Sequence, residues 1–337
     1  MFGVTFVGTL AILWALNRYL RWQRALACVL FALALFALLG FGLWHLEYGV
    51  QLWTVAGGLA SLVAGYVLGL KVLKARARPQ VTQTPKPLFN DTELERYARH
   101  IVLRELGGAG QKKLKQSKVL VVGAGGLGSP VLMYLTAAGV GTIGVIDDDT
   151  VEHTNLQRQI IHRDENTGQS KVQSAAAAMR ALNPFVEVRP YARRLTGENV
   201  GELLGDYDVI IDGTDNFSTR YLVNRSAVAL GKPLVSGALA QWEGQLSVFD
   251  PARGGPCYEC IFPKAPADGL APSCAEAGVV GPLPGVIGSM MALEAVKLIT
   301  GAGQVTRGEM LIYDGLYGES RKIKLARRDD CAACKNL

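Results

Sequence analysis

Nearly uncharged stretches at the N-terminal end most constrain how this chain folds. Apolar runs cover residues 2–16, 25–46 and 50–70, and Glu47 is the single acidic residue near them. The second and third runs are long enough to cross about 30 Å of hydrocarbon as helices, whereas the first is at or below the minimum length. Stretches this poor in charge are hard to place in water. The sequence therefore predicts an all-α transmembrane region of two or three helices over residues 1–78.

Basic residues predict how this region is oriented. Residues 1–78 hold seven Lys and Arg against one acid, which accounts for the whole formal net charge of +6. They fall between the first two runs and after the third: Arg18, Arg21, Arg24, Lys71, Lys74, Arg76 and Arg78. Because basic flanks stay on the cytoplasmic side, we expect residues 1–70 to lie in the inner or cytoplasmic membrane, with the rest of the chain facing the cytoplasm. A cleaved signal peptide fits less well, since two further apolar runs follow the first.

A proline-rich segment separates this region from a body of different composition. Residues 79–89 read PQVTQTPKPLF, and proline blocks regular backbone hydrogen bonding, so we expect an extended linker there. Residues 79–337 hold 28 basic and 28 acidic residues. A neutral body is a poor electrostatic footprint for nucleic acid, and no nucleic-acid partner is expected.

Short β-rich runs alternate with helical segments over residues 90–337. Strands are expected over 118–122, 142–147, 186–189, 208–212, 233–236, 244–249, 310–314 and 320–324. Helices are expected over 91–96, 111–115, 126–138, 170–182, 219–230 and 285–300. Asp91 or Thr92 is expected to cap the first of these helices. The alternation indicates an α/β fold with a Rossmann-like, doubly wound sheet, and the last two strands suggest a hairpin.

A glycine-rich turn follows the first expected strand. Gly123, Gly125 and Gly128 match G-x-G-x-x-G, with Gly126 inside the motif. Glycine lets the backbone approach a phosphate, and the following helix N-terminus supplies free amides. Asp147 ends the next strand, where a carboxylate would hold a ribose hydroxyl. Taken alone, these residues fit an NAD-dependent enzyme as well as an ATP-dependent one.

Charged residues further along the chain favour ATP. Arg158 lies in Asn155-Leu-Gln-Arg158-Gln, and Lys171 begins a helix. An enzyme that cleaves a triphosphate uses such cations to offset the charge that develops on it. Asp215 and Asn216 follow the fourth expected strand, at the edge where open α/β sheets bind ligands. A carboxylate there can hold Mg²⁺ against phosphate oxygens.

Four of the six cysteines form two C-x-x-C pairs, Cys257 with Cys260 and Cys331 with Cys334. Two thiolate pairs that close a tetrahedron are the arrangement of structural Zn²⁺, which we expect here. Unligated or redox-active thiols are the alternative. Cys274 lies apart from these pairs in a loop rich in proline, glycine and alanine.

These motifs, in this order, resemble the MoeB/ThiF/HesA family of ubiquitin-activating-like adenylyltransferases. The segments Arg96-Tyr-Ala-Arg99-His and Pro272-Ser-Cys274-Ala-Glu resemble the family as well. The resemblance covers about residues 90–334 and is nearest to the molybdopterin-synthase adenylyltransferase branch. It implies a ThiF/MoeB-type sheet with a zinc-bound C-terminal part over residues 90–337.

The resemblance also implies an activity: adenylation of the C-terminal glycine of a small ubiquitin-fold sulfur carrier, similar to MoaD or ThiS and ending in Gly-Gly. The reaction would consume ATP, require bound Mg²⁺ and release pyrophosphate. The adenylated carrier would then enter molybdopterin or thiamine-type sulfur transfer. The implied roles are Gly126 on the nucleotide, Asp147 on the ribose, Asn155 and Arg158 on ATP, Lys171 on the phosphates, Asp215 at Mg²⁺, and Arg99 in the partner subunit's site of a homodimer.

Two features of the resemblance concern sulfur chemistry. In part of the family, the cysteine that matches Cys274 bonds covalently to the carrier, and a simple loop cysteine is the alternative. Some relatives carry a C-terminal sulfurtransferase domain after the position that matches Cys334, and we expect none in this chain, whose given sequence ends three residues after Cys334. A separate sulfurtransferase is therefore an expected partner.

Three other functions stay open on the sequence. The tRNA-modifying dehydratase branch of the same superfamily also adenylates its substrate. An NAD-dependent oxidoreductase would use the same glycine turn but has little need for Arg158 and Lys171. A non-catalytic membrane scaffold could keep the fold to dock a ubiquitin-like protein.

Overall fold

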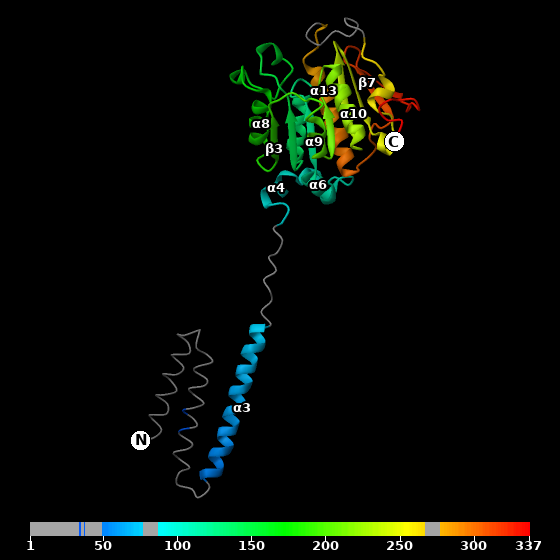
Figure 1. Ribbon diagram of the computed structural model, residues 1–337. Coiled ribbons are helices and arrows are strands. Elements are labelled where there is room, and N and C mark those ends of the chain that lie inside the picture. The colour runs from blue at the N-terminus through cyan, green and yellow to red at the C-terminus, as the bar shows by residue number, and fades with distance from the viewer. Residues whose placement is uncertain (1–33, 35–36, 38–48, 77–86, 267–276) are drawn as a thin grey trace. The chain divides into compact units, whose positions relative to one another are not determined.

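The computed structural model describes residues 34, 37, 49–76, 87–266 and 277–337 (Figure 1). The chain divides into two compact units, Met1–Lys86 and Pro87–Leu337. The first two predicted membrane runs lie outside the described residues, apart from two isolated positions. Most of the predicted linker, residues 79–86, lies outside them too.

The described part of the first unit is a long apolar helix, α3, which runs over Gly49–Arg76. Its large side chains are exposed, with Leu62 at 74%, Tyr66 at 69% and Leu68 at 67% of full exposure. Residues Val55–Lys74 are long and apolar enough to cross a membrane, with a mean hydropathy of 1.7 and no burial. This test rests on length and composition alone.

The second unit is built on an eight-stranded sheet in the order β3-β2-β1-β4-β5-β6-β7-β8. The strands are β1 Lys118–Val122, β2 Thr142–Ile146, β3 Glu187–Tyr191, β4 Val209–Asp212, β5 Leu234–Ala240, β6 Glu243–Phe249, β7 Glu309–Asp314 and β8 Glu319–Lys324. Every strand that the sequence predicts is present, within a few residues at its ends. Strands β3, β2, β1, β4 and β5 pair in parallel, and β5 to β8 pair antiparallel.

The prediction of a doubly wound sheet is correct for only part of the sheet. Only the five parallel strands follow that pattern. Two residues, Gln241 and Trp242, connect β5 to β6, and so short a loop joins only antiparallel strands. The predicted hairpin of the last two strands is confirmed as β7 and β8.

Helices cover both faces of the parallel strands. The helices of this unit are α4 Asp91–Arg96, α5 Ala98–Ile101, α6 Gly107–Gln116, α7 Gly128–Ala138, α8 Lys171–Leu182, α9 Val200–Gly205, α10 Phe217–Ala229, α11 Tyr258–Ile261 and α13 Pro282–Thr300 (Figure 1). Alternate strand residues face opposite ways: Val119 and Val121 pack into the cluster with α7, α8 and α13, whereas Leu120 and Val122 pack into the cluster with α9 and α10. This alternation explains why β1 is apolar throughout.

Two helical details differ from the sequence predictions. Asn90, and not Asp91 or Thr92, caps α4: its Oδ1 accepts from the Glu93 amide at 2.9 Å, and the Glu93 carboxylate accepts from the Asn90 amide at 3.2 Å. This reciprocal capping box satisfies two free donors at once. The short helices α5, α9 and α11 were not predicted from the sequence.

Helix α13 is long and apolar enough to cross a membrane, but it is half buried, which makes it a core helix of this unit.

Candidate functional site

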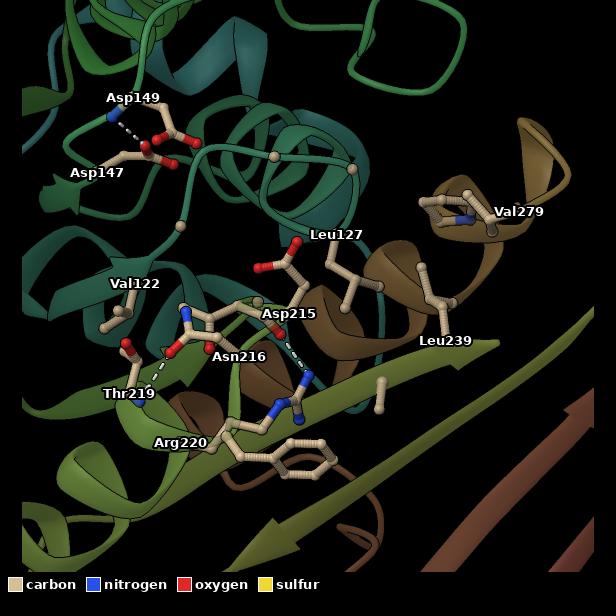
Figure 2. A pocket seen from close by; sticks show the side chains of 18 of the residues that line it. Val122, Leu127, Asp147, Asp149, Asp215, Asn216, Thr219, Arg220, Leu239 and Val279 are labelled. Carbon is tan, nitrogen blue, oxygen red and sulfur yellow. Dashed lines mark hydrogen bonds between the residues drawn. The ribbon is translucent and has the colours of Figure 1, made fainter. Parts of the chain in front are cut away.

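A cleft of about 830 Å³ opens where strands β1, β2 and β4 end. Because β1 lies between β2 and β4, the connections leave it toward opposite faces, and open α/β sheets bind ligands at such a point. Of the residues predicted from the sequence, the cleft is lined by Gly123, Gly125, Gly126, Asp147, Arg158, Lys171, Asp215 and Asn216. Figure 2 shows Asp147 and Asp149 at one end of it and Leu239 and Val279 at another.

The glycine turn that enters α7 is held by close backbone packing. A methyl group on Gly128 would lie 2.0 Å from the carbonyl oxygen of Gly123, so only glycine fits there. Gly123 itself has a φ of +97°, which favours glycine. Among the described residues, the amides of Gly126 and Leu127 donate to no acceptor. The turn therefore presents free N–H groups and the positive end of a helix dipole to the cleft, which suits a phosphate.

Asp147 is tied to this turn from the end of β2. Its carboxylate accepts from the amide of Ala124 at 2.7 Å and from the amide of Asp149 at 2.9 Å. Burial raises the pKa of Asp147 above its ordinary value, although the two amides oppose that shift. Each carboxylate oxygen has a second lone pair, so the group can still accept a ribose hydroxyl.

Two cations reach the cleft by different routes. Lys171 is 5% exposed, and its Nζ lies 2.8 Å from a carboxylate oxygen of the exposed Asp149. The guanidinium of Arg158 donates to the Oδ1 of Asn155 at 2.8 Å. Asn155 itself does not line the cleft. It orients Arg158 in the structure, whereas the resemblance implies direct contact with ATP.

A buried acid, Asp212, holds the loop that follows β4. The Asp212 carboxylate accepts from the amide of Thr214 at 3.0 Å and from the hydroxyl of Ser236 at 3.0 Å. Asn216 caps α10 by accepting from the Thr219 amide at 2.9 Å. Asp215 makes no hydrogen bond or ion pair among the described residues, and its carboxylate extends into the pocket (Figure 2). An unpaired carboxylate on a rigid loop is a suitable ligand for Mg²⁺.

Several residues that line the cleft were not predicted from the sequence. Arg220 is buried and donates to the carbonyl oxygens of Thr214 and Gly237, so it joins the β4 loop to β5. Arg193 and Arg194 follow β3 and line the cleft. They were open to prediction, because residues after parallel strands gather at one sheet edge.

The four cysteines of the two C-x-x-C pairs form one buried cluster. The Sγ of Cys257 lies 3.8 Å from that of Cys260 and 3.6 Å from that of Cys331, and the Sγ of Cys260 lies 3.5 Å from that of Cys334. Zn–S bonds of about 2.3 Å at tetrahedral angles give sulfur separations of about 3.8 Å. Burial raises the pKa of Cys334 to about 11, which makes a free thiolate unfavourable there without a cation. The donor set and its spacing fit Zn²⁺.

The cysteine cluster is connected to the cleft through one residue. Tyr258 lies between Cys257 and Cys260 in the sequence, and its side chain lines the cleft. Its ring packs against Phe262 with centroids 4.9 Å apart, and Phe262 also lines the cleft. The cysteines lie far from the glycine turn in the sequence, but in the tertiary structure the segment between Cys257 and Phe262 forms part of one cleft wall.

Two predicted residues lie elsewhere. Arg99 is exposed on α5, does not line the cleft of its own chain and has no partner among the described residues. Cys274 lies outside the described residues. The segment that contains it is flanked by Pro266 and Ala277, and both of these line the cleft.

Comparisons with known proteins relate this geometry to a family. Residues 97–333 match the ThiF family. The chain is 51% identical over 246 residues to a sulfur carrier protein adenylyltransferase of Thermus thermophilus, covering 72% of this chain and 91% of that protein. It is 46% identical over 243 residues to the SAMP-activating enzyme E1 of Haloferax volcanii, covering 72% of this chain and 89% of that protein.

Longer relatives and a solved structure are also similar. The chain is 48% identical over 246 residues to the probable adenylyltransferase/sulfurtransferase MoeZ of Mycobacterium tuberculosis, covering 72% of this chain but 63% of that protein. The crystal structure of E. coli MccB with ATP has a TM-score of 0.63 at 22% identity, over 72% of this chain and 75% of that one. At that identity the structural likeness shows the fold alone.

Removing one cysteine should test the zinc site. We expect Cys331→Ser to lose bound zinc and on the order of 3 kcal/mol or more of unfolding free energy, because structural zinc contributes to folding directly. Zinc content by atomic absorption and unfolding in urea measure the two effects. Cys274→Ser, which leaves the cluster intact, is the control. Full zinc occupancy in Cys331→Ser would contradict the assignment.

Proposed function

The chain belongs to the ThiF family, and we propose that it is an ATP-dependent adenylyltransferase that activates a small ubiquitin-like sulfur carrier protein. The observation that carries this proposal is a single cleft that joins a glycine turn, two cations and an unpaired carboxylate. The identities of 46–51% to enzymes named as acting on sulfur carriers or as SAMP-activating support the substrate class.

The reaction joins two anions, which explains the residues of the cleft. A carboxylate oxygen of the carrier's C-terminal glycine attacks the α-phosphorus of ATP, and the bond from that phosphorus to the pyrophosphate oxygen breaks. The free amides of Gly126 and Leu127 bind phosphate oxygens, while Lys171 and Arg158 offset the charge on the leaving pyrophosphate. Asp215 would hold Mg²⁺, which supplies further positive charge against the phosphates when bound.

The other half of the cleft suits an extended peptide. Its walls come from β5 and from the zinc-supported segment, and they include Leu239, Tyr258 and Phe262. A tail that ends in two glycines has no side chains that would exclude it from this part of the cleft. We therefore assign the carrier's C-terminal tail to this half, with its carboxylate directed at the nucleotide end.

The alternative activities can each be distinguished by a specific measurement. A tRNA-modifying dehydratase would show ATP turnover stimulated by tRNA, and an NAD-dependent oxidoreductase would bind NAD in preference to ATP. Three features of the cleft, the pairing of Lys171 with Asp149, the orientation of Arg158 and the unpaired Asp215, favour triphosphate chemistry over hydride transfer.

ATP–pyrophosphate exchange tests the cleft residues. With a carrier ending in Gly-Gly, we expect Lys171→Ala, Arg158→Ala and Asp215→Asn each to slow exchange by a factor on the order of 100 to 1000, as for other electrostatic stabilisers. Lys112→Ala, on the exposed face of α6, is the matched control and should exchange at the normal rate. Normal exchange in all three variants, or exchange without any carrier, would contradict the assignment.

We propose that the active enzyme is a homodimer in which Arg99 serves the site of the partner subunit. Arg99 is an exposed, unpaired cation outside the cleft of its own chain, among the described residues. Helices α7 and α13 pack together, and each exposes a large apolar side chain, Tyr134 at 59% and Leu293 at 62%. Large exposed apolar side chains commonly mark protein interfaces.

Mixed dimers test this arrangement. A heterodimer of an Arg99→Ala chain with a Lys171→Ala chain has one complete site, so we expect about half of the wild-type exchange rate although each homodimer is inactive. The chains are co-expressed with different tags and purified as the heterodimer. A heterodimer of Lys171→Ala with Arg158→Ala is the control, since neither site is complete. No recovery in the first pair would show that Arg99 acts in its own chain or not at all.

Sulfur transfer requires further components. We propose that a separate sulfurtransferase supplies sulfur to the adenylated carrier, since the name of MoeZ pairs adenylyltransferase with sulfurtransferase activity. Molybdopterin and thiamine-type pathways are both compatible with this chemistry. A covalent role for Cys274 stays a prediction. The positions of Pro266 and Ala277 at the cleft support it, because the chain between them begins and ends beside the reaction.

We also propose that residues 1–78 anchor the enzyme in the cytoplasmic membrane, with the second unit in the cytoplasm. The exposed apolar side chains of α3 and the basic residues that follow support this orientation. After cell fractionation, we expect the full chain in the membrane pellet and resistant to alkaline carbonate. Trypsin should digest the second unit in inverted vesicles but not in spheroplasts. Recovery in the soluble fraction would contradict the anchor.

A further inference from the structure

Gln159 carries an unused polar group within the cleft. Its side chain is 4% exposed and lines the cleft. Among the described residues, its Oε1 is buried without a hydrogen-bond partner, whereas its Nε2 donates to no acceptor and is not fully buried. Buried side-chain amides are almost always paired, so an unpaired one at a ligand site requires an explanation.

The backbone holds Gln159 firmly against the glycine turn. Its amide donates to the carbonyl oxygen of Asn155 at 3.0 Å, and its carbonyl accepts from the amide of His162 at 3.1 Å. The Nε2 of His162 lies 2.9 Å from the carbonyl oxygen of Ala124, which ties this segment to the turn. A methyl group on Gly125 would lie 3.6 Å from the Nε2 of Gln159. The amide therefore lies beside the backbone that faces a phosphate.

We propose that Gln159 is a further ATP-binding residue, whose side-chain amide donates to a phosphate oxygen beside the glycine turn. The inference rests on the proposed function, because it takes ATP as the ligand of this cleft. The Nε2 donor of the amide suits ATP, because phosphate oxygens accept hydrogen bonds.

The depth of the position explains the choice of residue. A lysine or arginine at this position, at 4% exposure and without an acidic partner, would be a buried, unpaired charge. A neutral amide adds a donor to the phosphate site at a smaller desolvation cost. Lys171 shows the alternative solution, because its equally buried ammonium is paired with Asp149.

The substitution Gln159→Met separates a binding role from a structural one. Methionine keeps the length of the side chain but removes both polar atoms, so the ligand-free protein no longer buries an unpaired amide. We expect its ligand-free melting temperature to equal or exceed that of the wild type, while the Kd for ATP rises roughly tenfold or more. A structural role would give the reverse: a lower melting temperature and an unchanged Kd.

The matched control is Gln173→Met, on the exposed side of α8, which should change neither quantity. Inorganic triphosphate and adenosine, titrated separately, show which part of the nucleotide the amide binds. We expect Gln159→Met to weaken triphosphate binding and to leave adenosine binding unchanged. Weaker adenosine binding with normal triphosphate binding would overturn the phosphate assignment.

These titrations use the full chain without a carrier, so they are independent of the exchange assay. If the wild type binds ATP and Gln159→Met binds it equally well, the role of Gln159 is wrong while the proposed function stands. If the wild type binds ATP but no carrier supports exchange, the carrier assignment fails and Gln159 is still tested. If the wild type binds no ATP, both proposals fail.

Discussion

The contact of three glycine backbones at the centre of the sheet is the constraint on which the rest of the site depends. Gly128 at the start of α7 lies against the carbonyl oxygen of Gly123, and Gly213 after β4 approaches both. No larger residue fits at Gly128. This packing directs the first amides of α7 into the cleft and places the ends of β1 and β4 side by side. Asp147 and Asp215 are then carried on opposite sides of one phosphate-binding turn.

The antiparallel half of the sheet supports the other wall of the cleft. After β5 the chain changes from parallel to antiparallel pairing, and the strands β6 to β8 extend the sheet away from the nucleotide. Their C-terminal end is fastened by the cysteine cluster, whose own segment supplies Tyr258 to the cleft. The cysteine cluster therefore supports the wall along which we place the carrier's tail. We expect disruption of the cluster to disturb this wall and, through it, the binding of the tail.

Local sequence motifs predicted much of the fold of the second unit and several residues of its cleft. The strands of the second unit, the glycine turn and the two C-x-x-C pairs all depend on residues close in sequence, and each lies where it was expected. The comparisons confirm the adenylation of a sulfur carrier that the resemblance implied. The cap at Asn90 was missed because the capping box depends on a reciprocal pair, which a search for single cap residues overlooks.

What the sequence determined by itself was therefore the class of fold, the glycine turn, the two cysteine pairs and the chemistry of the family. Each depends on short-range spacing, which backbone geometry converts directly into local structure. Only the tertiary structure decided which of these residues share a cleft. It assigned Asn155 to orienting Arg158, placed Arg99 outside its own site, and left the buried amide of Gln159 unpaired beside the turn. Burial and long-range pairing arise when distant segments pack together, and no local pattern encodes them.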